Sequence, residues 1–311
     1  MCCRRARPVV DCRPRHGARP RSVAMPITVR KIHKLFGAEI SGVDIREPVS
    51  ALVFGEIRAA FEEYSVLVFR DMPMDDATQI RFSEMFGPLE IAGKANPGVG
   101  TPFARQSNLD IQTGAVIPPE DRRMIYQLAN YFWHSDSSFK HIPSLCSMLT
   151  ARIVPPEGGD TEFCSMRAAY DSLSEEMKAK IEPLVVEHSL IHSRGLVDAS
   201  VLTEEMRAEL PGARQRMWRI NPINGRKALY MGAHASHVVG WPIEEGRALL
   251  DELTRTALKP EFCFAHKWRA GDSVLWDNRA VVHRATKYDT VKHKRLMQRT
   301  TIAGDQPTVP H

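Results

Sequence analysis

The sequence predicts a mainly β protein with added helices and a jelly-roll core. Many short strand-like runs follow one another in the second half of the chain, with turn residues between them. Helical stretches at about 166–182, 203–210 and 243–257 have the pattern of additions that cover a sheet face, rather than crossovers of a parallel sheet. The strand-like runs read SLCSMLTARIV, RMWRINP, KALYMG, EFCFAHKW, SVLWD, AVVHRA and LMQRTTIAG.

The first half of the chain mixes helices with a buried strand. Ala51–Tyr64 has helical spacing, and Ser65–Arg70 reads as a buried strand. Asp75 is placed to cap a second helix that runs to Phe86, where a Gly-Pro pair ends it. Residues 91–125 are rich in glycine, proline and polar residues, so we expect a long loop there. Loops of this length are usually functional, and a lid over a binding site is one such function.

Charge and composition separate the first 24 residues from the rest. The chain has 311 residues and a formal charge of +5, but residues 1–24 alone hold seven arginines and one aspartate. We expect this basic leader to be disordered, because it has no apolar periodicity. It could be an arm that binds nucleic acid or a transit peptide, but we favour an extension ahead of a start at Met25.

The remaining residues, 25–311, are expected to form one domain. They carry a formal charge of −1, which argues against nucleic acid as a partner because phosphate binding needs a clustered basic face. No stretch approaches about eighteen consecutive apolar residues, so no membrane span is expected. Their three cysteines, Cys146, Cys164 and Cys263, show no metal-binding spacing, and we expect buried free thiols in a reducing cytoplasm.

A candidate metal site begins at His134 and Asp136. On extended backbone, side chains two residues apart point to the same side, so one ion could bind both. His283, on a late apolar strand-like run, is the best candidate for a third ligand. Two histidines and one carboxylate leave adjacent positions open, which suits a non-haem Fe(II) site that activates O₂. The alternative is that His134 and Asp136 bind no metal, because a pattern as short as His-x-Asp often arises by chance.

Other histidines offer competing pairs. His188 and His192 are four residues apart, but their segment alternates more like a strand than a helix. His234 and His237 could also chelate a metal ion. Neither pair has an obvious carboxylate at ligand spacing, which favours the first candidate.

Two arginines and a threonine are candidates for anion binding. Arg295 and Arg299 would face the same way on a strand, and each guanidinium could bind a carboxylate. The alternative is a solvated basic strand, although the apolar continuation into Ile302 favours a core position. Thr161 follows a tight glycine turn and could donate its hydroxyl to a ligand oxygen.

Six stretches, taken together and in order, resemble the taurine dioxygenase superfamily of Fe(II)/2-oxoglutarate-dependent dioxygenases. Within that superfamily they are most similar to the 2,4-dichlorophenoxyacetate dioxygenases. The resemblance implies a double-stranded β-helix core, with Fe(II) as cofactor and 2-oxoglutarate and O₂ as cosubstrates. The stretches are WHSDSSF at 133–139, GGDTEFCSMRAAYD at 158–171, GAHASHVVG at 232–240, EGRALLDEL at 245–253, WDNRAVVHR at 276–284 and RLMQRTT at 295–301.

The resemblance also assigns roles to individual residues. His134, Asp136 and His283 match the iron ligands. Thr161 and Arg295 match residues that hold the distal carboxylate of 2-oxoglutarate.

A second group of matches concerns the substrate. Arg299 matches the arginine placed near the substrate's acid group and the inner carboxylate of the cosubstrate. Asn130 and His234 match substrate-contacting positions. Lys94 falls near a lysine of the herbicide-degrading enzymes if the alignment includes a one-residue gap.

The activity implied is hydroxylation of the carbon beside the ether oxygen of a phenoxyacetate-type acid. Its products would be a phenol, glyoxylate, succinate and CO₂. One alternative is the same chemistry on taurine, another sulfonate or a sulfate ester, and another is a non-catalytic jelly-roll binding protein. The resemblance also implies a small anionic aromatic substrate and a homo-oligomer.

Overall fold

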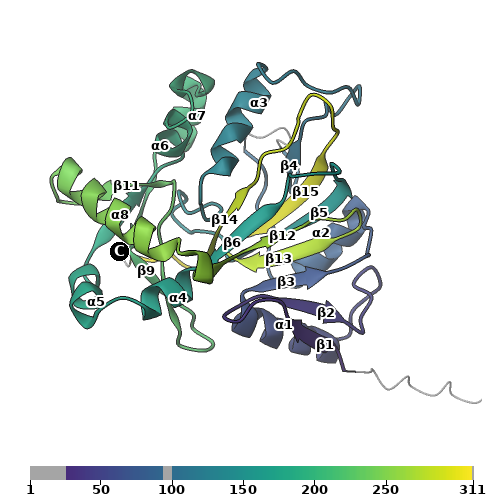
Figure 1. The fold of residues 1–311 in the computed structure, drawn as a ribbon, viewed down its shortest axis with the longest axis horizontal. Helices are drawn as coiled ribbons and strands as arrows, with labels where there is room; N and C mark the ends of the chain where they lie inside the picture. The colour runs from purple at the N-terminus through teal and green to yellow at the C-terminus, as the bar shows by residue number, and fades with distance from the viewer. Residues whose placement is uncertain (1–25, 94–99, 310–311) are drawn as a thin grey trace, which may run out of the picture.

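A seven-stranded sheet is the largest element of the protein (Figure 1). The computed structural model describes residues 26–93 and 100–309, so the predicted leader at 1–24 lies outside the described residues. β2 and β3 are parallel, and the other neighbouring strands are antiparallel. The order across the sheet is β1 (Thr28–Lys31), β2 (Ala38–Ser41), β3 (Val66–Phe69), β13 (Ser273–Asp277), β5 (Cys146–Ile153), β15 (Leu296–Ile302) and β4 (Phe103–Ser107).

A smaller sheet packs against the large one. It has three antiparallel strands in the order β12 (Cys263–His266), β6 (Thr161–Ser165) and β14 (Val281–Ala285). Side chains of both sheets form a buried cluster that includes Phe163 and Trp276. The two facing sheets agree with the predicted jelly-roll core.

Alternation along the strands decides which side chains enter the space between the sheets. In β13, Val274 and Trp276 belong to the cluster between the sheets, whereas Leu275 belongs to a cluster on the other side. Both faces of β13 are therefore buried, and for this reason the strand reads as a continuous apolar run.

Two helices cover the outer face of the large sheet. α1 (Ala51–Tyr64) begins at the predicted residue and buries Ile57 and Phe61 against that face. α2 (Asp76–Glu84) is capped by Asp75, whose carboxylate accepts a hydrogen bond of 2.8 Å from the amide of Thr78.

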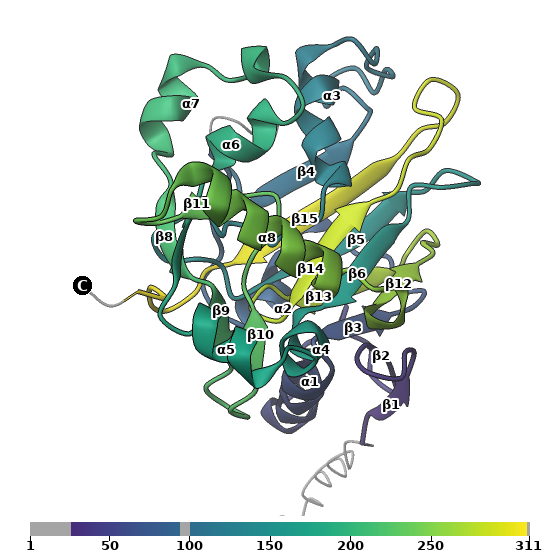
Figure 2. The ribbon, with the colours of Figure 1, turned by 60° about the vertical axis from the view of Figure 1, so that its left-hand side comes forward.

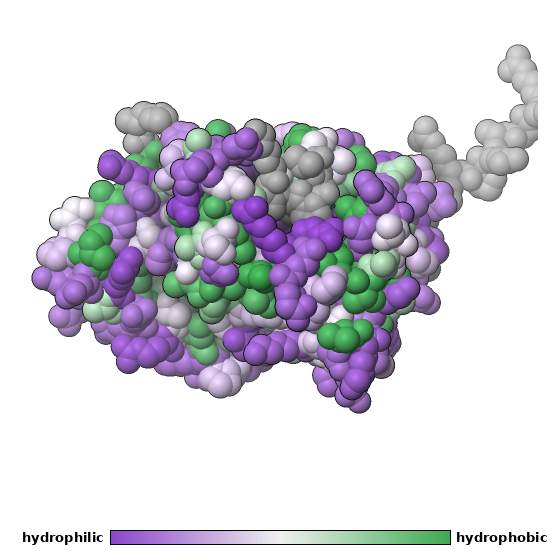
Figure 3. Space-filling view, turned by 90° about the horizontal axis from the view of Figure 1, so that it is seen from above, coloured by the Kyte–Doolittle hydropathy of each residue, from purple (hydrophilic) through white to green (hydrophobic). Residues whose placement is uncertain are grey.

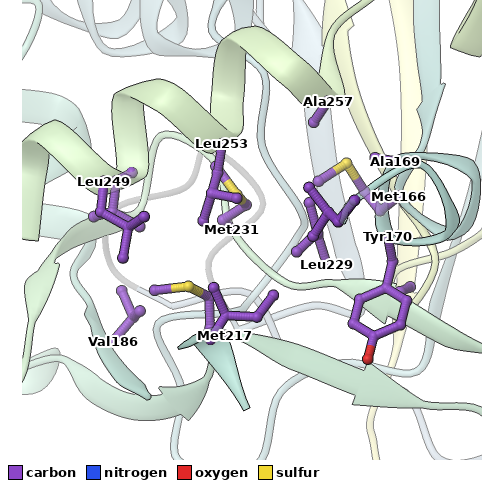
Figure 4. Close-up of a cluster of buried hydrophobic side chains, with 14 of the residues drawn as sticks. Met166, Ala169, Tyr170, Val186, Met217, Leu229, Met231, Leu249, Leu253 and Ala257 are labelled. Carbon is purple, nitrogen blue, oxygen red and sulfur yellow. The ribbon is translucent and has the colours of Figure 1, made fainter. Parts of the chain in front are cut away.

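α8 (Ile243–Ala257) covers the outer face of the smaller sheet (Figure 2). Its leucines lie over a cluster that includes Cys164 and Val282 of the smaller sheet. Figure 4 shows Leu249, Leu253 and Ala257 directed from the helix toward the methionines of this cluster.

The remaining elements surround this helix and the upper part of the fold. Strands form one three-stranded sheet, β11 (Ala235–Val238), β7 (Val185–His188) and β8 (Ala213–Arg216), and one pair, β10 (Lys227–Leu229) and β9 (Trp218–Ile220). Helices are α3 (Arg122–Gln127), α4 (Met166–Asp171), α5 (Glu175–Ile181), α6 (Leu190–Gly195) and α7 (Glu204–Glu209), with 3₁₀ turns η1 (Leu128–Tyr131), η2 (Ala199–Val201) and η3 (Pro260–Phe262). From above, hydrophobic residues form several separate patches among hydrophilic residues (Figure 3).

Three sequence-based expectations about elements need correction. The stretch 91–125 is not wholly a loop, because it contains β4 and the first residues of α3. β4 is an edge strand with polar residues at three of its five positions, so it lacks the apolar run that would indicate it. The helix expected at 166–182 is two helices, since Ser174 caps a separate α5. The strand expected to include both His188 and His192 ends at His188, and His192 lies on α6.

The expectation of three free thiols is wrong for two of them. Cys164 and Cys263 lie directly opposite each other on β6 and β12, with their Cα atoms 4.1 Å apart, and form a disulfide. Cys146 is a buried free thiol, as expected. Across the described part of the chain, no helix is long and apolar enough to cross a membrane.

Candidate active site

The three candidate metal ligands meet in the space between the two sheets. One donor atom from each of His134, Asp136 and His283 lies within 4.8 Å of the others, and all three residues are buried. The carboxylate oxygens of Asp136 are 3.8 Å from Nε2 of His134 and 3.7 Å from Nε2 of His283. Donor atoms that share one metal ion lie about 3 to 4 Å apart, because each is about 2 Å from it. The spacing therefore fits one ion.

Hydrogen bonds orient the ligands toward that position. Nδ1 of His134 donates to the carbonyl of Phe132 at 2.8 Å, which leaves the lone pair of Nε2 directed at Asp136. The hydroxyl of Ser147 donates to Asp136 Oδ2 at 2.7 Å. Asn278 accepts from the Asp136 amide at 3.3 Å and donates to Ser147 Oγ at 3.0 Å, so it supports both groups.

The charge states of the ligands suit a cation. Burial alone would raise the pKa of the Asp136 carboxyl. Arg299 and the two imidazoles lower that pKa by more than burial raises it, so the pKa lies well below its usual value. Burial lowers the pKa of both His134 and His283. An ionised carboxylate and two neutral imidazoles are the forms that bind divalent metals. The donor set therefore fits Fe(II).

β15 brings both predicted arginines to the same space. Met297 and Arg299 lie two residues apart on this strand, so they share a face, and Met297 belongs to the cluster between the sheets. Arg295 immediately precedes the strand. Arg299 donates from Nη1 to Asp136 Oδ1, while its Nε is buried without a hydrogen-bond partner among the described residues. Arg299 is thus already part of the metal-ligand cluster.

Arg295 is buried and forms no salt bridge with the described residues, although the charge of Asp160 acts on it. Its guanidinium donates to the carbonyl oxygens of Gln106 at 3.2 Å and Gly159 at 3.1 Å, and its Nε has no hydrogen-bond partner there. A buried guanidinium needs an anion to offset the cost of its desolvation. A ligand carboxylate could supply that charge.

Thr161 lies close to this guanidinium and has a free proton to donate. Its Oγ1 accepts a hydrogen bond of 3.0 Å from Nε1 of Trp268. A small cavity is lined by Thr161, Arg295, Arg299, His134 and His283. The cavity therefore connects the metal ligands with all three predicted anion-binding residues.

A second cavity, of about 180 Å³, shares His134 and Arg299 with the first. His234 is buried in its wall, with Nδ1 3.1 Å from the hydroxyl of Ser138 and its ring centroid 5.8 Å from that of His134. Asn130 lines both cavities and donates from Nδ2 to Gln106 Oε1 at 2.7 Å. Lys94 lies outside the described residues.

The competing histidines do not form metal sites in the described part of the chain. Among those residues, His134, Asp136 and His283 are the group of three whose donor atoms all lie within 4.8 Å of one another. His237 instead lies 2.9 Å from the hydroxyl of Ser236 through Nδ1.

Several residues of the site were not predicted from the sequence. Ser147 and Asn278 support Asp136 from positions more than ten residues away, and spacing gives no signal for such contacts. Tyr126, Phe139 and Arg194 line the larger cavity from helices and loops.

Comparison with known proteins identifies the family of the chain. Residues 28–301 match the family described as taurine catabolism dioxygenase TauD, TfdA family. The chain belongs to this family. It is 40% identical over 283 residues to an alpha-ketoglutarate-dependent 2,4-dichlorophenoxyacetate dioxygenase of Cupriavidus pinatubonensis, covering 89% of this chain and 98% of the relative. It is 34% identical over 278 residues to an (S)-phenoxypropionate/alpha-ketoglutarate-dioxygenase of Sphingobium herbicidovorans. That match covers 87% of this chain and 92% of the relative.

A solved structure agrees with these relatives. The crystal structure of AAD-2 in complex with Mn(II) and N-oxalylglycine, a 2-oxoglutarate analogue, matches with a TM-score of 0.85 and 40% identity. The match covers 92% of this chain and 100% of that one. The predicted family, the jelly-roll fold and the enzyme class are thereby confirmed. The TauD/TfdA chain is a 2-oxoglutarate-dependent dioxygenase, with Fe(II) as its metal.

Proposed function

We propose that this TauD/TfdA enzyme oxidises the carbon beside the ether oxygen of a phenoxyacetate-type acid. The observation that carries the proposal is the shared wall of the two cavities. His134 and Arg299 line both, so a cosubstrate in the smaller cavity and a substrate in the larger one would meet at the metal ligands. The substrate class is supported by the relatives named for 2,4-dichlorophenoxyacetate and (S)-phenoxypropionate.

In this proposal His134, Asp136 and His283 hold Fe(II). Bound iron, with 2-oxoglutarate and O₂, supplies the oxidant that replaces a C–H hydrogen with a hydroxyl group. Ser147 and Asn278 keep the Asp136 carboxylate in position. The histidines remain neutral because burial lowers their pKa, so protons do not compete for their lone pairs at neutral pH.

Arg295 and Thr161 would hold the distal carboxylate of 2-oxoglutarate. The guanidinium of Arg295 is fixed by two carbonyl oxygens and has no carboxylate partner among the described residues. The hydroxyl of Thr161 already accepts one bond from Trp268 and can donate its own proton. Together they offer a charged and a neutral donor at one end of the smaller cavity.

Arg299, with His234, Asn130 and Lys94, would orient the substrate so that its CH₂ faces the iron. Rate enhancement would come mainly from this positioning rather than from acid–base catalysis. One oxygen atom of O₂ enters the substrate and the other enters succinate, as 2-oxoglutarate loses CO₂. The hydroxylated product is a hemiacetal, which breaks its C–O bond to give a phenol and glyoxylate.

Succinate release from Fe(II), O₂ and 2-oxoglutarate tests the proposal. The panel contains phenoxyacetates, 2-phenoxypropionates, cinnamates, taurine and alkyl sulfates. We expect phenoxyacetates to stimulate succinate release and to yield equimolar phenol and glyoxylate. Turnover of taurine or alkyl sulfates without the phenoxy acids would refute the proposed substrate class.

We further propose a lid role for the segment 91–125, a homo-oligomeric state and a cytoplasmic location. The larger cavity is lined by Ile91, Ala92 and Gly93 at one end of that segment, and this supports its contact with substrate. Proteolysis with and without ligand, sedimentation velocity and cell fractionation would test the three in turn.

A further inference from the structure

Arg194 presents a positive charge to the larger cavity from a helix that the sequence did not connect with the site. It lies on α6, together with Leu190 one turn earlier. Residues four apart share one helix face, and both of these side chains line the cavity. The amide of Ser189, which caps α6, donates to the carbonyl of His234 at 2.8 Å. This bond ties α6 to the opposite part of the cavity wall.

The Arg194 guanidinium is held in place by an aromatic ring. Its Cζ lies 4.3 Å from the ring centroid of Tyr126 on α3, and Tyr126 also lines the cavity. α3 and α6 stand next to each other in both ribbon views (Figures 1 and 2). Stacking uses the face of the guanidinium and leaves the N–H groups at its edge for another partner.

No carboxylate within the described part of the chain pairs with Arg194. Its Nε is buried without a hydrogen-bond partner there. Two other cations of the cavity differ in this respect, since Lys140 pairs with Glu90 at 2.6 Å and Arg299 binds Asp136. Arg194 is therefore a partly buried charge that faces a cavity and forms no salt bridge with the described residues, although Glu209 also lines that cavity.

Arg105 is the competing cation of the same cavity. It lies on β4 and also lines a neighbouring cavity, which contains the carboxylate of Asp110. No stacked ring holds its guanidinium among the contacts of the described residues. Arg194 is thus the better-fixed of the two groups.

We propose that Arg194, stacked on Tyr126, binds the carboxylate of the anionic aromatic substrate and so determines specificity for acids. This inference rests on the proposed function and deepens it. Arg194 would then take the substrate carboxylate that the proposed function assigns to Arg299, and Arg299 would remain with Asp136 and the cosubstrate. A neutral ether that lacks the carboxylate would lose this contact.

Kinetics with a charged and a neutral substrate test the inference. Succinate release is measured for the wild type, Arg194→Gln, Arg194→Lys and Arg105→Gln, with phenoxyacetate and with neutral 2-phenoxyethanol. Arg207→Gln is the matched control, because Arg207 is a partly exposed arginine paired with Glu204 and does not line the cavity.

Loss of one charge-assisted contact predicts a KM for phenoxyacetate raised about tenfold or more in Arg194→Gln. The KM for 2-oxoglutarate and the kinetics with 2-phenoxyethanol should change little, and Arg194→Lys should recover part of the loss. An unchanged KM, an equal loss for both substrates, or a larger loss in Arg105→Gln would overturn the inference.

A binding measurement separates this inference from the proposed function. Phenoxyacetate is titrated calorimetrically into wild type and Arg194→Gln, each loaded with Fe(II) and 2-oxoglutarate under anaerobic conditions. Weaker binding to the variant without any turnover by the wild type would refute the proposed function and keep the inference. Equal binding to both proteins, or none to either, would overturn the inference.

Discussion

His134 and His283 are joined by two backbone hydrogen bonds. The amide of each donates to the carbonyl of the other, at 3.0 and 2.9 Å, and the ring centroids lie 4.3 Å apart. His283 belongs to β14, whereas His134 lies in a connecting segment that pairs with the strand at this one point. The backbone therefore sets the spacing of the two imidazoles before any metal binds.

We predict that His134→Ala or Asp136→Ala abolishes substrate-dependent succinate release. Each change removes one of the three groups whose donor atoms lie within 4.8 Å of one another. His237→Ala is the control, since His237 lies outside this group. Wild-type turnover by either variant with added Fe(II) would show that the triad is not the metal site.

Ser147→Ala should weaken Fe(II) binding by about 10- to 100-fold, as is usual when a ligand loses its supporting hydrogen bond. The hydroxyl lost is the one that donates to Asp136 Oδ2 at 2.7 Å. Fe(II) titration of activity measures the effect. Ser83→Ala removes another buried hydroxyl, 2.6 Å from that of Thr300, and controls for general destabilisation. Equal Fe(II) affinity in Ser147→Ala and wild type would contradict the assigned contact.

Arg295→Ala should raise the KM for 2-oxoglutarate by about 10- to 100-fold, the range expected for a lost charge-assisted hydrogen bond. The KM for the aromatic acid should change much less, because Arg295 lines the smaller cavity and not the larger one. Steady-state succinate release at varied 2-oxoglutarate gives both constants. The exposed Arg269 provides the matched control, Arg269→Ala. An unchanged apparent affinity would remove Arg295 from the cosubstrate site.

Local pattern was enough to predict much of the fold. α1 was predicted at its observed residues because its apolar spacing and its buried face coincide. Asp75 was predicted as the cap of α2 because capping depends on residues a few positions apart. β4 escaped prediction because it is an edge strand, stabilised by pairing with the distant β15.

In the site too, some residues could be predicted from the sequence and others could not. His134 and Asp136 are two residues apart, and residue type and spacing were enough to indicate them, with His283 as the third ligand. The same reasoning indicated the two arginines as carboxylate-binding groups, but the family resemblance was needed to assign them to the cosubstrate and the substrate. The contact of Ser147 with Asp136 and the stack of Arg194 on Tyr126 depend on tertiary packing. Similarly, the pairing of Cys164 with Cys263 depends on the register of β6 and β12, strands separated by 99 residues.

The last prediction concerns acid stability and His188. This residue ends β7, is 1% exposed and stacks on Tyr230, with ring centroids 5.4 Å apart. Burial lowers the pKa of His188 to about 3. In the unfolded chain a histidine has a pKa of about 6.5, so below that pH the unfolded state binds a proton that the folded state does not.

The free energy of unfolding should therefore fall as the pH falls from about 6.5 toward 3, with His188 contributing up to about 1.4 kcal/mol per pH unit. Urea unfolding of wild type and His188→Gln between pH 7 and pH 4 measures this slope. The variant should show the shallower slope, whatever its stability at neutral pH, because its side chain binds no proton in either state. His237→Gln, at a half-buried position, is the control. Parallel curves for wild type and His188→Gln would mean that His188 takes up its proton in the folded protein as readily as in the unfolded chain.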